Sequence, residues 1–211
     1  MKLENKKIAF LGDSITAGSG TTGPDKIFHQ LIKQKYNLAQ AYNCGIGGTR
    51  IARQTNPTIS CITHDLYFAL RAQVMPRDVD AVVVFGGTND YGHGDAKFGT
   101  PDSTDEYTFY GALNSLCTQL KSDYPNSKII FLTPLHRVSD DTPCAPEGKL
   151  LSDYVNAIVE IAENYGFSVI DLFGADILDP YNPALVPDGL HPSDKGHEIM
   201  ADYIAKELLK I

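Results

Sequence analysis

The sequence of 211 residues lacks several features that mark particular classes of protein. It has no cluster of basic side chains, because 18 lysines and arginines stand against 26 acidic residues and leave a net charge of −8. No apolar run reaches the roughly 18 residues of a membrane span, and the opening MKLENKK has no apolar signal core. We therefore expect no nucleic-acid partner, no membrane span and a cytoplasmic location.

Cysteine is also scarce, with Cys44, Cys61, Cys117 and Cys144 as its four occurrences. They form no C-x-x-C pair and no zinc spacing, and four are too few for a disulfide scaffold in a chain of this length. Free thiols are therefore expected. Internal repeats and low-complexity linkers are absent too, so residues 1–211 are predicted to form one domain.

Short apolar runs alternate along the chain with amphipathic stretches. The predicted strands cover residues 8–11, 39–44, 80–85, 128–132 and 167–172, and the predicted helices cover residues 24–36, 63–74, 103–124, 151–166 and 193–208. Strands that alternate with helices in this way indicate an α/β fold. We expect a three-layer α/β/α sandwich around a five-stranded parallel sheet.

Some of these predictions rest on single local signals. The spacing of Ile62, Leu66, Leu70 and Val74 predicts the buried face of the second helix. Ser103 and Glu106 have the spacing of a capping box at the start of the third helix, and Ser193 is the predicted cap of the last one. Residues 91–102 and 133–148 are predicted to be long irregular loops, which are often functional.

Three candidate site residues, Ser14, Gly48 and Asn89, each come just after one of the first three predicted strands. Ser14 comes after the turn at Gly12, Gly48 lies in a glycine-rich loop, and Asn89 follows a pair of glycines. In a parallel sheet the carboxyl ends of the strands share one edge, where open α/β sheets bind their ligands. These three residues should therefore converge there.

A fourth segment, ahead of the last helix, carries Asp188 three residues before His191. A serine hydroxyl needs a neighbouring base to become a nucleophile, and histidine is suited to that role near neutral pH. A carboxylate on the other ring nitrogen fixes the tautomer and stabilises the imidazolium. The sequence thus supplies a nucleophile, a base and an orienting carboxylate.

Together, the segments Gly-Asp-Ser14, Gly48, Gly-Thr-Asn89-Asp and Asp188-x-x-His191 resemble, in content and order, the SGNH hydrolases, the superfamily of GDSL-type esterases and lipases. The resemblance implies a flavodoxin-like fold and a cofactor-free esterase. It implies Ser14 as nucleophile, His191 as base, Asp188 as its partner and Asp13 as a supporting residue. The Ser14 and Gly48 amides and the Asn89 side chain would form the oxyanion hole, with a slip to Gly47 possible.

Other interpretations stay open at this stage. Asp13, Asn89, Asp188 and His191 are also ligand types for a metal-dependent phosphoesterase, although this would leave Ser14 without a role. A non-catalytic carbohydrate-binding module on the same fold is a further alternative. The expected partner is a small-molecule ester, for which acetylated sugars, lysophospholipids, thioesters and metabolite esters all remain candidates. The sequence gives no indication of oligomeric state.

Several residues near these segments have simpler interpretations. Cys44 is expected to fill space beneath the turn rather than to act as a nucleophile. His64, His93, His136 and His197 show no metal-binding spacing and are expected to be surface or helix-face residues. Arg50, Arg53 and Arg137 are predicted either to reach substrate from loops at the edge of the site or to be solvated.

Overall fold

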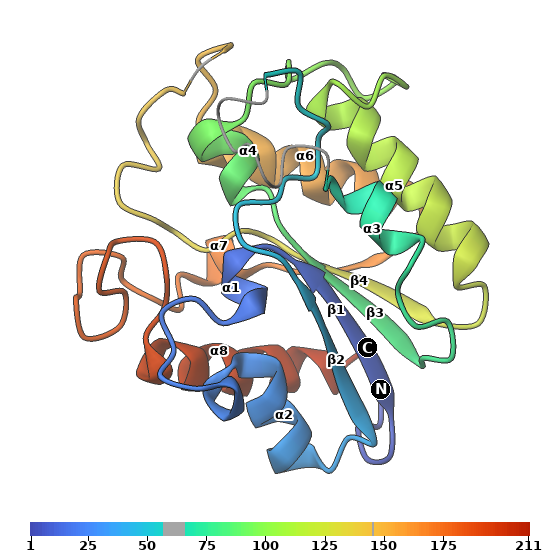
Figure 1. The fold of residues 1–211 in the computed structure, drawn as a ribbon, viewed down its shortest axis with the longest axis vertical. Helices are drawn as coiled ribbons and strands as arrows, with labels where there is room; N and C mark the ends of the chain where they lie inside the picture. Colours follow the sequence, from blue (N-terminus) through green and yellow to red (C-terminus); the bar gives the residue numbers. More distant parts are fainter. Residues whose placement is uncertain (57–65, 145) are drawn as a thin grey trace.

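A sheet of five parallel strands lies at the centre of the computed structural model, which describes residues 1–56, 66–144 and 146–211 (Figure 1). The strands are β1 (Lys7–Gly12), β2 (Gln40–Gly45), β3 (Ala81–Phe85), β4 (Lys128–Leu132) and β5 (Ser168–Ile170). Their order in the sheet is β2-β1-β3-β4-β5. The chain therefore turns to one side after β1 and to the other side after β2, which opens a crevice beyond the ends of β1 and β3.

Helices cover both faces of the sheet. They are α1 (Ser14–Ala17), α2 (Phe28–Tyr36), α3 (Phe68–Ala72), α4 (Thr88–His93), α5 (Phe109–Asp123), α6 (Leu151–Asn164), α7 (Leu172–Ala175) and α8 (Asp194–Leu208), with a 3₁₀ turn at Pro24–Lys26. Figure 1 shows α2 and α8 on one side of the sheet and α3, α5 and α6 on the other. The predicted five-stranded three-layer sandwich is confirmed.

The central strand β3 shows why the sheet has two buried faces. All five of its residues are buried, and their side chains alternate between two apolar clusters. Val82 and Val84 belong to the cluster that includes residues of α3, α5 and α6, whereas Val83 and Phe85 belong to the one with residues of α2 and α8. A continuous apolar run is the pattern expected of a parallel strand covered on both sides.

The second predicted helix is the largest error of the sequence interpretation. In its described part, α3 covers only Phe68–Ala72, and residues 63–65 lie outside the described residues. The predicted core positions Leu70 and Val74 are 39% and 85% exposed, while Arg71 is 6% exposed. A short helix held by tertiary contacts need not follow the periodicity of its apolar residues, and here an arginine faces inward.

Local signals also misplaced the boundaries of several other elements. Thr108 rather than Ser103 caps α5, since its hydroxyl accepts the Gly111 N–H at 3.1 Å. The predicted helix 24–36 is divided at Ile27, and the predicted strand 167–172 is shorter because α7 begins at Leu172. The predicted loop 91–102 loses its first three residues to α4. By contrast, Ser193 caps α8 as predicted.

The first three strands end level with one another. Gly12, the last residue of β1, pairs with the last residues of its two neighbours, Gly45 on β2 and Phe85 on β3. The three strands therefore end side by side. The segments that follow these strands begin at one edge of the sheet, as the sequence pattern predicted. No helix in the described part of the chain is long and apolar enough to cross a membrane.

Candidate active site

Ser14 stands at the first residue of α1, immediately beyond β1. Asp13 precedes it as the N-cap, and its carboxylate accepts the Ile15 N–H at 3.0 Å. A side chain at Gly12 is impossible without rearrangement, because its Cβ would lie 2.0 Å from Thr16 Oγ1. The tight turn thus fixes the position of Ser14, which is 7% exposed, at the edge of the sheet.

His191 and Asp188 come from the loop before α8 and meet Ser14 at this edge. Ser14 Oγ lies 2.9 Å from His191 Nε2, and His191 Nδ1 lies 2.7 Å from Asp188 Oδ2. The other oxygen of Asp188 accepts the N–H groups of Leu190 and His191 at 3.0 and 2.7 Å. The three side chains therefore form a continuous hydrogen-bonded chain from hydroxyl to carboxylate.

The pKa values of the two carboxylates near Ser14 are shifted in opposite directions. Partial burial of Asp188 works against its ionisation, but the hydrogen bonds from His191 and Leu190 outweigh it and lower the pKa to about 2. Complete burial instead raises the pKa of Asp13 to about 6, against the opposing effects of the Ile15 N–H, Arg71 and His191. Asp188 is consequently an anion at neutral pH, positioned to orient the imidazole.

The glycine-rich loop after β2 lies against Ser14. A Cβ built on Gly47 would come within 3.7 Å of Ser14 Cβ, and Gly48 has the left-handed φ of 74°. Thr49 closes this turn, since its hydroxyl donates to Ile46 O at 2.7 Å. Both glycines considered from the sequence therefore belong to the same turn, and Gly47 is the one with a contact to Ser14.

Asn89 approaches from α4, the helix that follows β3. Its side chain is 3% exposed, and its Nδ2 donates to Thr49 O at 3.0 Å. Its Oδ1 lies 3.0 Å from His93 Nε2, one helical turn further on. The neighbouring Asp90 accepts the N–H groups of Ile51 and Ala52 at 3.0 and 2.8 Å, which attaches the segment after the glycine loop to α4.

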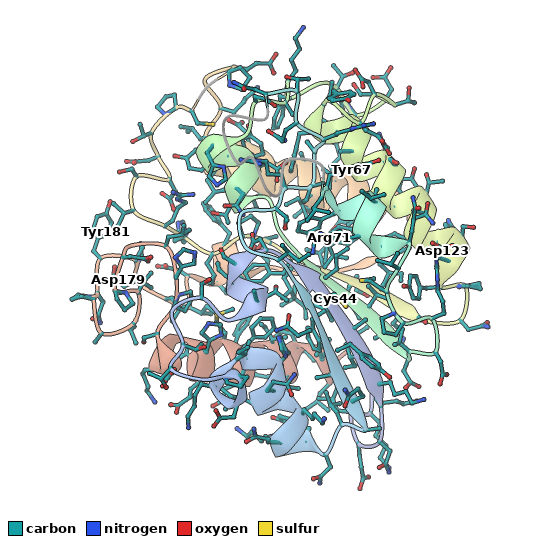
Figure 2. All side chains as sticks on the ribbon, in the orientation of Figure 1. Cys44, Tyr67, Arg71, Asp123, Asp179 and Tyr181 are labelled. Atoms are coloured by element: carbon teal, nitrogen blue, oxygen red, sulfur yellow. The ribbon has the colours of Figure 1, made fainter. Side chains whose placement is uncertain are left out.

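Arg71 is a part of the site that the sequence did not indicate. Its guanidinium donates to Gly12 O, Cys44 O and the hydroxyl of Thr49 at 2.8 to 2.9 Å, and so joins the ends of β1 and β2 to the glycine loop. In Figure 2 it lies beside Cys44, near the ends of these strands. Burial lowers the pKa of Arg71 to about 10, a value at which it still carries its charge at neutral pH.

Arg50 differs from its sequence interpretation, whereas His93 and His197 lie on helices as predicted but make contacts that the sequence did not indicate. Arg50 is 2% exposed, so it is neither solvated nor free to reach a substrate. His93 is exposed overall, yet its ring contacts both Arg50 and Asn89. His197 is completely buried on its helix face, and its Nδ1 accepts the Phe28 N–H. His64 lies outside the described residues.

The four side chains considered for a metal site are mostly bonded to other partners. Asp188 binds His191, Asn89 binds Thr49 O and His93, and one oxygen of Asp13 accepts the Ile15 N–H. Across residues 1–56, 66–144 and 146–211, no three histidine, cysteine or acidic side chains are grouped so that they would hold a metal ion. Cys44, Cys117 and Cys144 are free thiols, and Cys61 lies outside the described residues.

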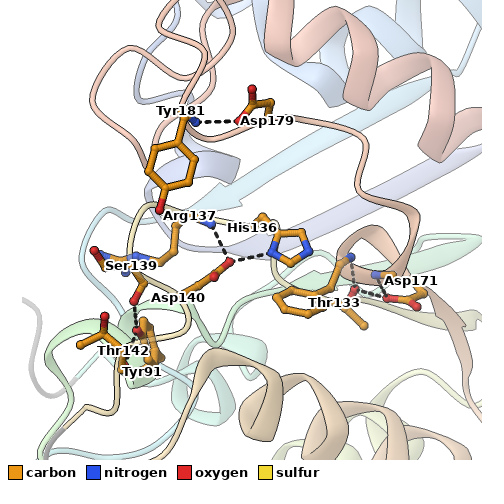
Figure 3. A network of polar contacts seen from close by, with 12 residues as sticks. Tyr91, Thr133, His136, Arg137, Ser139, Asp140, Thr142, Asp171, Asp179 and Tyr181 are labelled. Carbon is orange, nitrogen blue, oxygen red and sulfur yellow. Dashed lines mark hydrogen bonds and ion pairs between the residues drawn. The ribbon is translucent and has the colours of Figure 1, made fainter.

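The loop that follows β4 also lies at this edge of the sheet. Residues 133–142 of this loop take part in the polar network in Figure 3, in which Asp140 accepts from His136 Nδ1 and the Arg137 N–H at 2.6 and 3.2 Å. The Val138 N–H donates to Gly189 O at 2.8 Å. This bond joins the loop to the segment that carries Asp188 and His191, so both form one wall of the site.

Comparison with known proteins agrees with this architecture. The model of the GDSL-like lipase/acylhydrolase family matches residues 10–199. A solved structure from Lactobacillus plantarum is 31% identical, with a TM-score of 0.82 and 98% of both chains covered. The acetyl xylan esterase AlAXEase, at 23% identity, shares the fold with a TM-score of 0.65 over 96% of this chain and 99% of its own.

A curated relative, the isoamyl acetate-hydrolyzing esterase 1 homolog of Homo sapiens, is 28% identical over 134 residues. The alignment covers 59% of this chain and 53% of the human protein, so the chain spans about half the length of the curated relatives it matches. The family model covers residues 10–199, which is most of the chain, and the solved structure from Lactobacillus plantarum shares the fold over nearly its whole length. The chain belongs to the GDSL-like lipase/acylhydrolase family, which confirms the resemblance drawn from its motifs.

Proposed function

We propose that the chain hydrolyses carboxylic esters through Ser14, His191 and Asp188. The observation that carries this proposal is the unbroken contact from Ser14 Oγ through both nitrogens of His191 to Asp188, with separations of 2.9 and 2.7 Å. Both lie within the range expected of a nucleophile paired with its base and of a base paired with its orienting group.

The proposed reaction has two halves. Ser14 Oγ attacks the ester carbonyl carbon while His191 Nε2 takes its proton, and the imidazolium is stabilised by ionised Asp188. His191 then gives the proton to the departing alcohol, which leaves an acyl group on Ser14. In the second half, His191 removes a proton from water, the resulting hydroxide attacks the acyl carbon, and Ser14 regains its proton as the acid is released.

Negative charge develops on the carbonyl oxygen in both halves. We assign its stabilisation to the N–H groups of Ser14 and Gly48 and to the Asn89 side chain, with the adjacent Gly47 as the alternative backbone donor. Asn89 uses one Nδ2 hydrogen for Thr49 O, and its amide has a second hydrogen for the oxyanion. Buried donors fixed before the reaction are the usual means of stabilising such an oxygen.

The proposed substrates carry a short acyl group on a polar alcohol. The name of the human relative specifies an acetate ester, which supports the acyl side. The alcohol side rests on residues 91–102 and 133–148, the two long loops predicted from the sequence, which we expect to border the site. Their side chains are mainly polar, and Phe98 is only 8% exposed. Val138 is the one large aliphatic side chain that is exposed among the described residues of these two loops, with an exposed fraction of 37%. Polar groups in a site suit hydroxyl-rich ligands.

The deciding experiment is hydrolysis of p-nitrophenyl acetate by the purified protein with EDTA and without added metal. The proposed chemistry requires a nucleophile, a base and hydrogen-bond donors, so we expect the same rate with and without the chelator. Loss of activity with EDTA and recovery with a divalent cation would instead favour a phosphoesterase. Sugar binding without turnover of any ester would favour the carbohydrate-binding module.

A further inference from the structure

Arg50 is a buried guanidinium, and among residues 1–56, 66–144 and 146–211 no carboxylate is bonded to it. Its Nη2 donates to His93 Nδ1 and also lies 3.3 Å from His93 O, while Nε and Nη1 have no hydrogen-bond partner in the part of the chain that the structure describes. Asp90 and Asp95 are near enough to favour its charged form, but the hydrogen bonds of both go to other groups. A buried cation held mainly by an imidazole is unusual enough to need an explanation.

The contacts of His93 determine which of its nitrogens carries the proton. A guanidinium has only donors, so Nδ1 of His93 must accept from Arg50. A neutral imidazole has one acceptor and one donor, which leaves Nε2 as the protonated nitrogen. His93 is exposed overall, but its ring is partly buried where it contacts Arg50 and Asn89. This partial burial, together with the charges of Arg50 and Arg137, lowers the pKa of His93 to about 4, so the ring is neutral at physiological pH.

The tautomer of His93 in turn determines the orientation of the Asn89 amide. Nε2–H of His93 must face an acceptor, which is Oδ1 of Asn89 at 3.0 Å. The Nδ2 group then faces Thr49 O, also at 3.0 Å. If the amide were reversed, two donors would meet at His93 and two acceptors would meet at Thr49, and both contacts would become repulsive.

We propose that Arg50 and His93 form a positioning relay that fixes the Asn89 amide with its nitrogen toward the ester carbonyl. This inference rests on the proposed function, in which Asn89 is an oxyanion donor. The relay has a second effect, because the Arg50 charge polarises the hydrogen bond from His93 to Asn89 in surroundings of low dielectric constant. It thereby strengthens the remaining N–H of Asn89 as a donor.

Two substitutions at His93 separate a relay from simple packing. His93→Gln supplies an amide with one acceptor and one donor group, which suits Arg50 on one side and Asn89 on the other. His93→Leu fills similar space without hydrogen bonds. We expect His93→Leu to lower kcat by about tenfold to a hundredfold with little change in KM, and His93→Gln to retain kcat within about threefold. Asn89→Ala removes the proposed oxyanion donor itself, so its expected fall in kcat, about 10²–10³-fold, is the largest effect that loss of the relay could have.

Arg50→Met tests the origin of the relay. We expect a fall in kcat of a few fold at nearly constant KM, and Arg77→Met serves as its matched control. Arg77 also carries one positive charge, but it precedes β3 at the opposite edge of the sheet and pairs with Asp123. The control should therefore keep the kcat of the unsubstituted protein.

Nitrogen NMR of the unsubstituted protein tests the same relay without measuring activity. In protein with ¹⁵N-labelled histidine, the assigned ring of His93 should carry its proton on Nε2, and Arg50→Met should mix the two tautomers. A proton on Nδ1 of His93 in the unsubstituted protein would overturn the proposal. So would equal kcat for folded His93→Leu and His93→Gln, since a role in packing alone predicts that result.

The proposed function is checked separately with Ser14→Ala. If Ser14→Ala is inactive while folded His93→Leu keeps the full kcat, the relay is wrong and the nucleophile stands. If Ser14→Ala keeps the activity, the assignment of the site itself is wrong, and the relay, which rests on it, is withdrawn with it.

Discussion

Arg71 Nη2 donates to Gly12 O at 2.9 Å across 59 positions of sequence, and so holds the last carbonyl of β1 directly ahead of Asp13 and Ser14. The same guanidinium binds Cys44 O at the end of β2. One side chain therefore sets the separation between the turn that carries Ser14 and the glycine loop. Its charge makes these hydrogen bonds stronger than those of a neutral donor.

Removing this guanidinium should weaken the whole edge of the sheet. Arg71→Met removes the charged donor from the carbonyls of Gly12 and Cys44 and from the Thr49 hydroxyl, although Gly12 O still accepts the Ile46 N–H at 3.1 Å. We expect a loss of about 2–4 kcal/mol in the free energy of unfolding. Urea denaturation measures this loss. Arg53→Met, in which the lost guanidinium stacks on Tyr67 and Tyr107, is the comparison and should cost about 1 kcal/mol or less. Similar losses in both variants would contradict the role of Arg71.

The proposed triad predicts strongly non-additive kinetics. Ser14→Ala and His191→Ala should each reduce kcat to near background, and the double variant should be no slower, because the two side chains act as one unit. Single-turnover and steady-state rates with p-nitrophenyl acetate measure this. Substantial activity in Ser14→Ala would exclude Ser14 as nucleophile. Cys44→Ala is the control for damage around the turn and should remain active.

The acyl group preferred by the enzyme should be short. Across p-nitrophenyl esters of two to twelve carbons, we expect kcat/KM to be highest between acetyl and about butyryl, because interfacial lipases need a large apolar surface that the bordering loops do not supply. Acetate release from acetylated sugars and from isoamyl acetate then compares a polar with an apolar alcohol. An optimum at eight carbons or more would contradict the prediction and leave the serine mechanism intact.

Acid should destabilise the fold through its buried histidines. His29 is fully buried, with Nε2 donating to Thr16 O and Nδ1 accepting from Gln30, and burial lowers its pKa from 6.5 to about 4. As the pH falls through this window, the unfolded chain binds a proton that the folded chain excludes. The stability present above pH 6.5 is therefore lost progressively toward pH 4, by roughly 3 kcal/mol for this residue.

His29→Gln removes the titrating group and keeps an N–H donor for Thr16 O. We expect its free energy of unfolding to fall less steeply than that of the unsubstituted protein between pH 6.5 and 4, as measured by urea denaturation at several pH values. His197, whose pKa is also lowered to about 4, mainly by burial and in part by His29, titrates in both proteins, so the comparison measures His29 together with its effect on His197. Parallel pH dependences would show that His29 does not contribute.

The sequence determined the strands, the parallel sheet and the residues that meet at its edge. Each of these features depends on patterns that are local in the chain, such as the apolar run of β3, the glycine pair before Thr88 and the spacing of Asp188 and His191. The topology of a parallel sheet then brings the ends of its strands together. The sequence therefore predicted that Ser14 lies close to the segment with Asp188 and His191, before any interatomic distance was known.

The tertiary structure alone decided what surrounds those residues. Arg50 was predicted either to reach substrate or to be solvated, and Arg71 was not singled out, yet both are buried. Arg71 bonds to groups 22 to 59 positions away, and Arg50 bonds through one of its nitrogens to His93, 43 positions away. His93 contacts Asn89 because residues Thr88–His93 form α4, a helix that was not predicted from the sequence and that places the two side chains one turn apart. The burial of a charged side chain depends on the partners that the fold brings to it, and no local pattern in the sequence records them.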